Sequence, residues 1–206
     1  MTAPRKGFPV VLSAASGTGK TTLGQRLIQT VPHLTLSVSY TTRAPRQGER
    51  EGADYHFIDT ARFDEMVRAN AFIEWAEVHG NLYGTAFAEV QATLDAGEDV
   101  LLDIDVQGGK QIRQRFADKQ ALMIFLLPPS LGELSRRLAA RGTESASDFQ
   151  KRMLNARREI EGASVYDFLI VNDDVELASR RLCEVVEIER LRRVNKAGLI
   201  QQVLGS

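Results

Sequence analysis

Several features that would assign a protein to a class at once are scarce in this sequence. Cys183 is the only cysteine among 206 residues, so no disulfide can form within the chain, and a reducing compartment is the simpler setting. No apolar run approaches the roughly 18 residues that a membrane-spanning helix needs. Basic residues (26) nearly balance acidic ones (27), whereas binding to a phosphate backbone usually requires a basic excess. We therefore expect a cytoplasmic protein whose main partner is neither a membrane nor nucleic acid.

Histidine is also scarce, which narrows the chemistry. His33, His56 and His79 are not spaced as metal ligands are, and we expect each of them at the surface or in packing. No serine, cysteine and histidine are arranged as a catalytic triad. The sequence therefore indicates neither a histidine-bound metal centre nor a nucleophile of the triad type.

The remaining composition and the apolar pattern are typical of one α/β domain. Hydrophobic residues make up 43% of the chain and charged residues 26%. Four apolar runs are continuous rather than alternating, as in strands covered on both faces: 8–14, 99–105, 121–127 and 167–173. Segments with helical spacing follow them, at 21–31, 106–116, 130–141 and about 175–203. This alternation predicts a parallel, doubly wound central sheet with flanking helices.

Two segments interrupt the strand–helix alternation. Between about 34 and 96, short strand-like pieces alternate with polar loops, which predicts a small α+β insertion packed beside the sheet. Residues 141–150 are small and polar and precede a strongly charged helix, which suggests a mobile flap. We expect a single domain over 1–206, with a core of 1–33 and 97–206, an insertion of about 34–96 and a lid of about 141–158.

The segment SAASGTGKTT (13–22) nearly matches the phosphate-binding loop pattern G-x-x-x-x-G-K-[ST]. Ala14 stands where the pattern has its first glycine, and a small residue with negative φ is acceptable there. A glycine-rich turn with an exposed lysine is the alternative. The buried strand before the segment and the helix after it favour a nucleotide site.

In such a loop, glycines let backbone N–H groups curl around phosphate oxygens, and the next helix presents its N-terminal dipole to the anion. Lys20 would reach the outer phosphates, and the Thr21 hydroxyl would ligate Mg²⁺. The loop predicts binding of a nucleoside triphosphate by Ala14, Ala15, Ser16, Gly17, Thr18, Gly19, Lys20, Thr21 and Thr22.

The insertion carries a second set of polar residues. Arg43 and Arg46 lie in one loop, where two guanidinium groups repel each other unless an anion lies between them. Glu74 could accept hydrogen bonds from the N1–H and N2–H₂ groups of guanine, whereas adenine lacks the N1 donor. The set therefore favours a nucleoside monophosphate that carries guanine. Hydroxyl donors nearby in the sequence are Tyr55, Tyr83 and Thr85.

Two aspartates end one of the predicted core strands. Asp103 and Asp105 are two residues apart, so we expect them on the same face of the sheet. One could hold Mg²⁺ through water while the other contacts guanine, because ligands bind at the carboxyl ends of such strands. Trp75 alternates with Glu74, and we expect it to pack inward on the opposite face.

Taken together, these motifs resemble the guanylate kinase family. The resemblance covers essentially the whole chain and rests on SAASGTGKTT, SVSYTTRAPRQGE, GADYHF, FIEWAEVHGNLYGT, LLDIDVQG, LPPS, RGTE and LIVNDD. It implies a fold of the P-loop nucleoside monophosphate kinase type with a GMP-binding insertion. It also implies the small-molecule substrates ATP and GMP (with dGMP), the cofactor Mg²⁺, and direct phosphoryl transfer in purine metabolism.

The resemblance further implies roles for individual residues. Four of them would recognise the guanine base: Ser39, Glu74, Thr85 and Asp105. Four would hold the GMP phosphate, with Glu49 supporting their loop: Arg43, Arg46, Tyr55 and Tyr83. Four would offset the charge of the transferring group: Lys20, Arg43, Arg141 and Arg152. Asn172 would lie near the adenine of ATP, and Thr21 and Asp103 would hold the metal.

Two other interpretations stay open at this point. One is a binding module that has the fold but has lost catalysis, although Lys20 and Thr21 are both retained here. The other is a kinase for another acceptor, such as a phosphorylated ribose, which would leave the Glu74 carboxylate unpaired. A homo-oligomer is compatible with all three interpretations.

Overall fold

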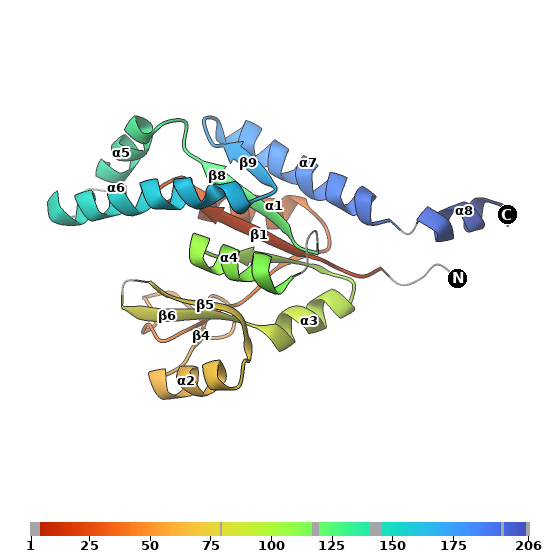
Figure 1. Ribbon diagram of the computed structural model, residues 1–206, viewed down its shortest axis with the longest axis horizontal. Coiled ribbons are helices and arrows are strands. Elements are labelled where there is room, and N and C mark those ends of the chain that lie inside the picture. The colour runs from red at the N-terminus through yellow and green to blue at the C-terminus, as the bar shows by residue number, and fades with distance from the viewer. Residues whose placement is uncertain (1–4, 79, 117–119, 141–145, 195, 205–206) are drawn as a thin grey trace.

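A parallel five-stranded sheet forms the centre of the computed structural model, which describes residues 5–78, 80–116, 120–140, 146–194 and 196–204 (Figure 1). Its strands lie in the order β2-β7-β1-β8-β9. Their bounds are Leu34–Leu36 (β2), Asp99–Asp103 (β7), Pro9–Ala14 (β1), Leu122–Leu127 (β8) and Phe168–Val171 (β9). The alternating strands and crossover helices predicted from the sequence are therefore present.

Helices cover both faces of this sheet, which explains the continuous apolar runs. In β1, Val10 belongs to a core with α1 (Lys20–Thr30) and α7 (Val175–Arg193), whereas Val11 belongs to a core on the other face. The second core includes α3 (Phe87–Asp95), α4 (Val106–Arg115) and a short 3₁₀ helix (Gly162–Val165). Neighbouring residues of a strand point to opposite faces, so both must be apolar in a strand covered twice.

A third apolar cluster joins two helices to the phosphate-loop segment. Leu134 and Leu138 of α5 (Leu131–Ala139) and Ala156 of α6 (Ala146–Glu161) are buried around Ala15. In Figure 1, α6 runs beside the carboxyl end of the central sheet. Ala15 is thus part of the packing between the loop and these helices.

The insertion forms a second, mixed sheet below the first one in Figure 1. Its strands lie in the order β4-β3-β6-β5, with α2 (Thr60–Arg68) on one face. Phe63 of α2 is fully buried and stacks on Phe72, with ring centroids 4.5 Å apart. The strand bounds are Tyr40–Thr41 (β3), His56–Phe57 (β4), Phe72–Val78 (β5) and Asn81–Ala86 (β6).

Three expectations differ from the structure. Residues 34–36, assigned to the insertion, pair in parallel with β7 and form the edge of the central sheet. The segment 175–203 is not one helix, because α7 ends at Arg193 and α8 (Lys196–Leu204) projects away from the body of the molecule (Figure 1). Trp75 does lie on the opposite side of β5 from Glu74, but its side chain is 40% exposed rather than packed inward.

Among the helices that the structure describes, none combines the length and the apolar character needed to cross a bilayer.

Candidate functional site

The phosphate-loop segment connects β1 to α1, at the carboxyl edge of the central sheet. Ala14 is the last residue of β1 and has a negative φ, so its Cβ is accommodated without strain. Gly17 and Gly19 have φ values of 90° and 102°, a region that favours glycine. The backbone therefore curls where the glycines stand and continues directly into the N-terminus of α1.

Asn172, just after β9, anchors this loop. Its side-chain amide donates to the Thr18 carbonyl at 2.7 Å, and its backbone N–H donates to the Leu127 carbonyl at 2.8 Å. A Cβ at Gly19 would lie 2.7 Å from the Asn172 amide nitrogen, too close for any other residue. Asn172 thus fixes the loop against the end of the sheet.

The Lys20 ammonium lies between the loop and the end of β7. It contacts the Asp103 carboxylate and donates to the Ile104 carbonyl at 3.0 Å. Its side chain remains about one quarter exposed, at 24%. These partners hold the positive charge at the mouth of a cavity instead of letting it extend into solvent.

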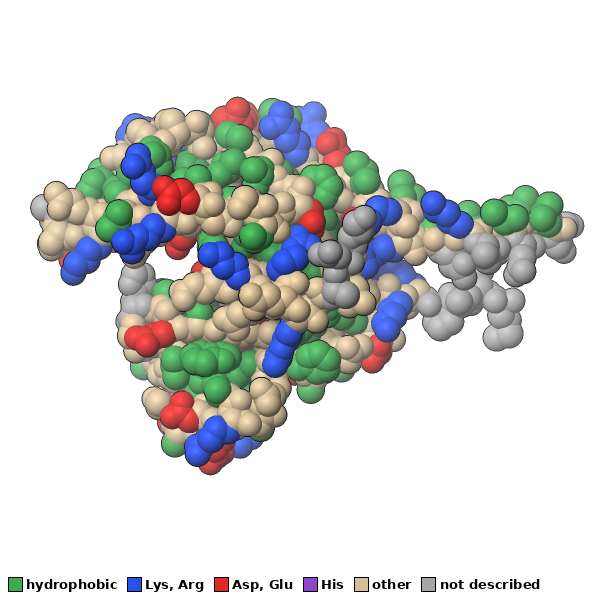
Figure 2. All heavy atoms as spheres, in the orientation of Figure 1, with side chains coloured by type: hydrophobic (Ala, Val, Ile, Leu, Met, Phe, Trp, Pro, Cys, Tyr) green, Lys and Arg blue, Asp and Glu red, His purple; other side chains and the backbone are tan. Residues whose placement is uncertain are grey.

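That cavity, of about 360 Å³, lies between the central sheet and the insertion. Figure 2 shows the molecule hollowed between α6 and the insertion sheet. The cavity collects expected nucleotide-site residues from both halves of the chain: Lys20, Thr21, Ser39, Tyr55, Glu74, Tyr83, Asp103 and Asp105. Of the other expected residues, Thr85 and Arg43 are hydrogen-bonded to residues that line the cavity, Glu74 and Tyr83.

The oxygen donors of this cavity fit a magnesium ion. Thr21 and Asp103 both line it, and Mg²⁺ takes hard oxygen ligands, usually one or two from protein with water and phosphate completing the shell. In the part of the chain that the structure describes, no group of three or more His, Cys, Asp or Glu gathers as a metal site. The donor set therefore suits an ion that arrives with a nucleotide rather than one held in a protein cage.

Glu74 is the buried acid of the cavity. Only 5% of the residue is exposed, and the Thr85 hydroxyl donates to its carboxylate at 2.6 Å. The Ser39 hydroxyl lies 3.5 Å from that of Thr85. Burial, with a smaller contribution from the nearby Asp105 charge, raises the pKa of Glu74 to about 7, although the Thr85 hydrogen bond opposes the shift. A buried carboxylate with a spare oxygen is suited to accept further hydrogen bonds from a ligand.

A β-bulge in β5 determines where Glu74 points. Phe72 pairs with Ala86 and Glu74 with Thr85, so Ile73 is an extra residue in the ladder. Phe72 and Trp75 both contact Phe63 on the α2 side, although residues three apart in a regular strand face opposite ways. Without the bulge, Glu74 would share the face of Phe72. The bulge instead directs the carboxylate into the cavity.

The N-terminus of α4 forms the wall behind Glu74. Asp105 caps this helix, since its carboxylate accepts the Gly108 N–H at 2.9 Å. A Cβ built at Gly108 would collide with the Glu74 carboxylate. Gly108 is therefore a site residue that the sequence analysis did not identify, and the signal was a pair of glycines inside a helical segment.

The arginine loop is organised around Glu49. The Arg43 guanidinium donates to both Glu49 carboxylate oxygens, at 3.0 and 2.8 Å, and to the Tyr83 hydroxyl at 3.3 Å. Glu49 also accepts the Arg46 backbone N–H at 2.7 Å. The hydrogen bonds from Arg43 lower the pKa of Glu49, and the same pair raises the pKa of Arg43. The Tyr55 ring lies 5.4 Å from the Arg43 guanidinium, while Arg46 itself is exposed.

Helix α6 contacts the phosphate loop through two of its side chains. Arg152 donates to the Ser16 hydroxyl at 3.0 Å, and the Ser16 N–H donates to the Glu159 carboxylate at 3.3 Å. Arg141 lies outside the described residues. One of the two expected lid arginines is thus in contact with the loop.

Comparison with known proteins gives a consistent result. The family model described as guanylate kinase matches residues 6–189. The guanylate kinase of Neisseria gonorrhoeae is 47% identical over 204 residues, covering 99% of this chain and 98% of that protein. The guanylate kinase of Novosphingobium aromaticivorans is 46% identical over 201 residues, covering 98% and 90%. The crystal structure of guanylate kinase from Anaplasma phagocytophilum superimposes with a TM-score of 0.78 at 33% identity, covering 98% of this chain and 96% of that one. The chain belongs to the guanylate kinase family.

Proposed function

We propose that the protein transfers the γ-phosphoryl group of ATP to GMP, and also to dGMP, yielding ADP and the corresponding diphosphate. The observation that carries the proposal is the cavity itself. A phosphate-loop lysine stands at one side of it, and a buried, hydrogen-bonded carboxylate, Glu74, stands at the other. A phosphoryl donor and a base-carrying acceptor could therefore meet in a single cavity.

Guanine complements the insertion side of the cavity. The spare acceptor capacity of Glu74 suits the N1–H and N2–H₂ donors of guanine, and the hydroxyls of Ser39 and Thr85 can donate to or accept from the base. Adenine would place the N1 lone pair against the carboxylate. An acceptor without a base would leave Glu74 buried and unpaired, which is the kind of mismatch that sites reject strongly.

The transfer itself requires positioning and charge neutralisation rather than a covalent intermediate. The loop backbone and Lys20 would hold the ATP phosphates, and Arg43, Arg46, Tyr55 and Tyr83 would hold the GMP phosphate. Asn172 would adjoin the adenine while it anchors the loop. Thr21 and Asp103 would hold Mg²⁺, which when bound would supply charge neutralisation for the donor phosphates. Arg152, with Arg141, would donate to the oxygens of the migrating group.

We further propose that the insertion acts as the GMP-binding subdomain and that the segment of residues 141–158 acts as a lid. The position of α6 supports the second assignment, since Arg152 already contacts Ser16 of the phosphate loop. The single cysteine is consistent with action in the cytoplasm.

An ADP-release assay tests the proposal directly. The protein is supplied with ATP and Mg²⁺ and, in separate reactions, with GMP, dGMP, AMP, UMP or ribose bisphosphate. We expect turnover with GMP and dGMP only, and loss of turnover when Mg²⁺ is chelated. Activity confined to AMP or the sugar bisphosphate would overturn the assignment, and no activity with any acceptor would favour a binding module.

A variant control shows that the activity belongs to this site. Lys20→Met keeps the length of the side chain but removes its charge, and we expect kcat with GMP to fall by a factor of about 100 to 1,000. If Lys20→Met retains full activity in a preparation shown to be free of other kinases, the proposed role of Lys20 is wrong.

A further inference from the structure

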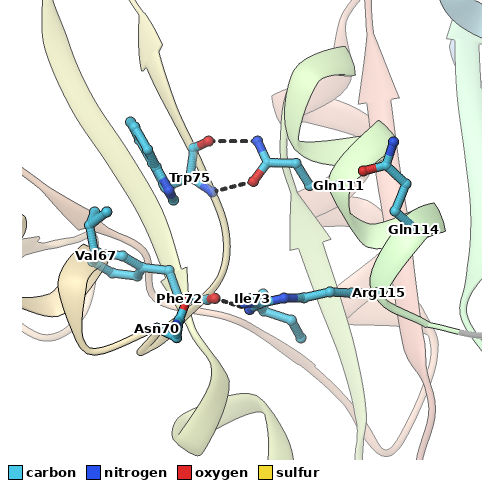
Figure 3. Close-up of a pocket in the computed structure, with 8 residues that line it drawn as sticks. All are labelled: Val67, Asn70, Phe72, Ile73, Trp75, Gln111, Gln114 and Arg115. Carbon is cyan, nitrogen blue, oxygen red and sulfur yellow. Dashed lines mark hydrogen bonds between the residues drawn. The ribbon is translucent and has the colours of Figure 1, made fainter.

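Helix α4 occupies the open edge of the insertion sheet. β5 is the last strand of that sheet and pairs with β6 on one side only. On its other side, the Gln111 side chain accepts the Trp75 N–H at 3.2 Å and donates to the Trp75 carbonyl at 2.7 Å (Figure 3). A single side-chain amide therefore supplies the donor and the acceptor that a neighbouring strand would supply.

Two further residues of α4 contact β5 on either side of this pair. Arg115 donates to the Phe72 carbonyl, and Gly108 lies against the Glu74 carboxylate. Residues 108, 111 and 115 are three and four apart, so they lie on one face of the helix. The three contacts thus bracket the bulge at Ile73, where the ladder to β6 is interrupted.

Because of the bulge, these contacts affect the position of the Glu74 carboxylate. A bulged strand has an unpaired residue and a local bend, so its ladder alone constrains the following residues less than a regular ladder does. Trp75 directly follows Glu74, and its two backbone groups are fixed to the same helix whose cap, Asp105, lines the cavity. Any shift of Trp75 relative to α4 therefore moves the Glu74 carboxylate relative to Asp105 and Gly108.

We propose that Gln111 is a positioning residue for recognition of the guanine base: by pairing with the backbone of Trp75, it sets where the Glu74 carboxylate stands in the cavity. The inference rests on the proposed function, since it concerns the acceptor that Glu74 recognises. Gln111 itself would touch neither substrate.

Replacing Gln111 with leucine removes both hydrogen bonds while preserving similar bulk. We expect Gln111→Leu to raise the KM for GMP about five- to tenfold, the size expected for a lost pair of hydrogen bonds that orient a recognition group. The KM for ATP should stay within about twofold, because the phosphate loop is anchored through Asn172 instead. The preference for GMP over inosine monophosphate, which lacks the 2-amino group, should fall.

The same helix offers a matched control. Gln114 and Gln111 both line a pocket between α4 and β5 that is separate from the cavity of Glu74 (Figure 3). Gln114 is exposed, and among the described residues its side chain has no hydrogen-bond partner. Gln114→Leu should leave both KM values and the GMP preference unchanged. Gln111→Asn shortens the side chain by one methylene, so that its amide cannot reach both Trp75 groups, and it should reproduce the effect if the leucine variant folds poorly.

A double-variant cycle distinguishes an effect on the position of Glu74 from a general loosening of the insertion. In a Glu74→Gln background, Gln111→Leu should change the KM for GMP much less than in the wild type, because its effect acts through Glu74. Equal effects in both backgrounds, or a Gln111→Leu variant that matches Gln114→Leu, would overturn the inference. If the wild type itself does not phosphorylate GMP, the proposed function fails instead.

Discussion

At the scale of single residues, Glu74 shows that a binding group can be unfavourable for the fold that carries it. Its carboxylate is almost fully buried and receives one side-chain hydrogen bond, from Thr85, in the part of the chain described. Desolvation of the charged form is not offset by a cation in contact, which is why the pKa of Glu74 rises to about 7. Sites that must accept ligand donors commonly retain such unfavourable groups.

This cost predicts that Glu74→Gln stabilises the ligand-free protein in a pH-dependent manner. Below pH 4.5 the carboxyl is protonated in both the folded and unfolded states and contributes nothing. As the pH rises to about 7, only the unfolded state ionises, so the stability of the wild type falls. Above that range, the difference between a pKa of 4.5 in the unfolded state and about 7 in the folded state lowers the free energy of unfolding of the wild type by about 3 kcal/mol. Urea unfolding of both proteins at pH 5 and pH 8 measures the difference, and an equal difference at both values would contradict it.

The same titration predicts how GMP affinity depends on pH. Only the ionised carboxylate accepts both guanine donors, so the KM for GMP should rise as the pH falls below about 7, by up to about tenfold at pH 6. The KM for ATP serves as the internal reference over the same range. In Glu74→Gln the KM for GMP should be high and nearly independent of pH; a wild-type profile that is flat between pH 6 and 8 would contradict the prediction.

Residue types and spacing were enough to predict many of the residues that line the cavity, but not the residues that support them. The loop residues, Glu74 and the two aspartates at and beyond the end of β7 have chemical types that indicate their use. Gln111 and Gly108 are a common polar residue and a glycine within a helical segment. Their importance depends on α4 lying beside β5, and Gln111 is 36 residues from its partner Trp75. Sequence patterns describe one element at a time and cannot supply that contact.

At the scale of elements, the strands that were predicted correctly are those with a long, continuous apolar run in the sequence. The four continuous runs became β1, β7, β8 and β9 within two residues at each end. β2 was assigned to the insertion because it is three residues long and its last two residues are exposed. The bulge in β5 was not predicted either, because an extra residue leaves no mark in composition. Short edge strands and bulges are defined by their partners rather than by their own residues.

The placement of α6 predicts how this helix contributes to the transfer. Arg152 extends from this helix to Ser16, a contact on the donor side of the cavity and away from Glu74. Arg152→Ala should therefore lower kcat by a factor of about 100 while changing the KM for GMP less than threefold, because its charge matters most in the transition state. Arg141→Ala should behave in the same way.

Steady-state kinetics with GMP varied at saturating ATP checks this prediction, and Arg158→Ala on the same helix serves as a control. An Arg152→Ala variant that loses GMP affinity while keeping kcat would show that the residue acts in acceptor binding rather than in transfer.

At the scale of the whole molecule, the C-terminal helix α8 lies apart from the two sheets that form the site. The apolar residues of α8 that the structure describes face solvent, with Leu199 56% and Leu204 81% exposed. Figure 1 shows α8 extending away from both sheets. The cavity lies at the opposite, carboxyl edge of the central sheet, so we expect α8 to contribute little to catalysis.

Truncation after Val194 tests this separation. We expect kcat and both KM values within about twofold of the full chain and a Tm within about 3 °C, because α8 adds little to the buried core. Light scattering on both proteins reports the association state in the same experiment. A truncated protein with kcat reduced tenfold would show that α8 supports the site.

The bulge at Ile73 gives β5 one residue more than its partner strand on the side that faces the central body. Removing Ile73 would restore a regular ladder in which Glu74, now next to Phe72, still points away from Phe63 and into the cavity. The carboxylate would stay, but the second core would lose the side chain of a residue that is only 2% exposed. For this fold, the extra residue of β5 therefore links the insertion to the central sheet, and a redesign of base specificity can replace Glu74 and its hydrogen-bond partners without changing the length of the strand.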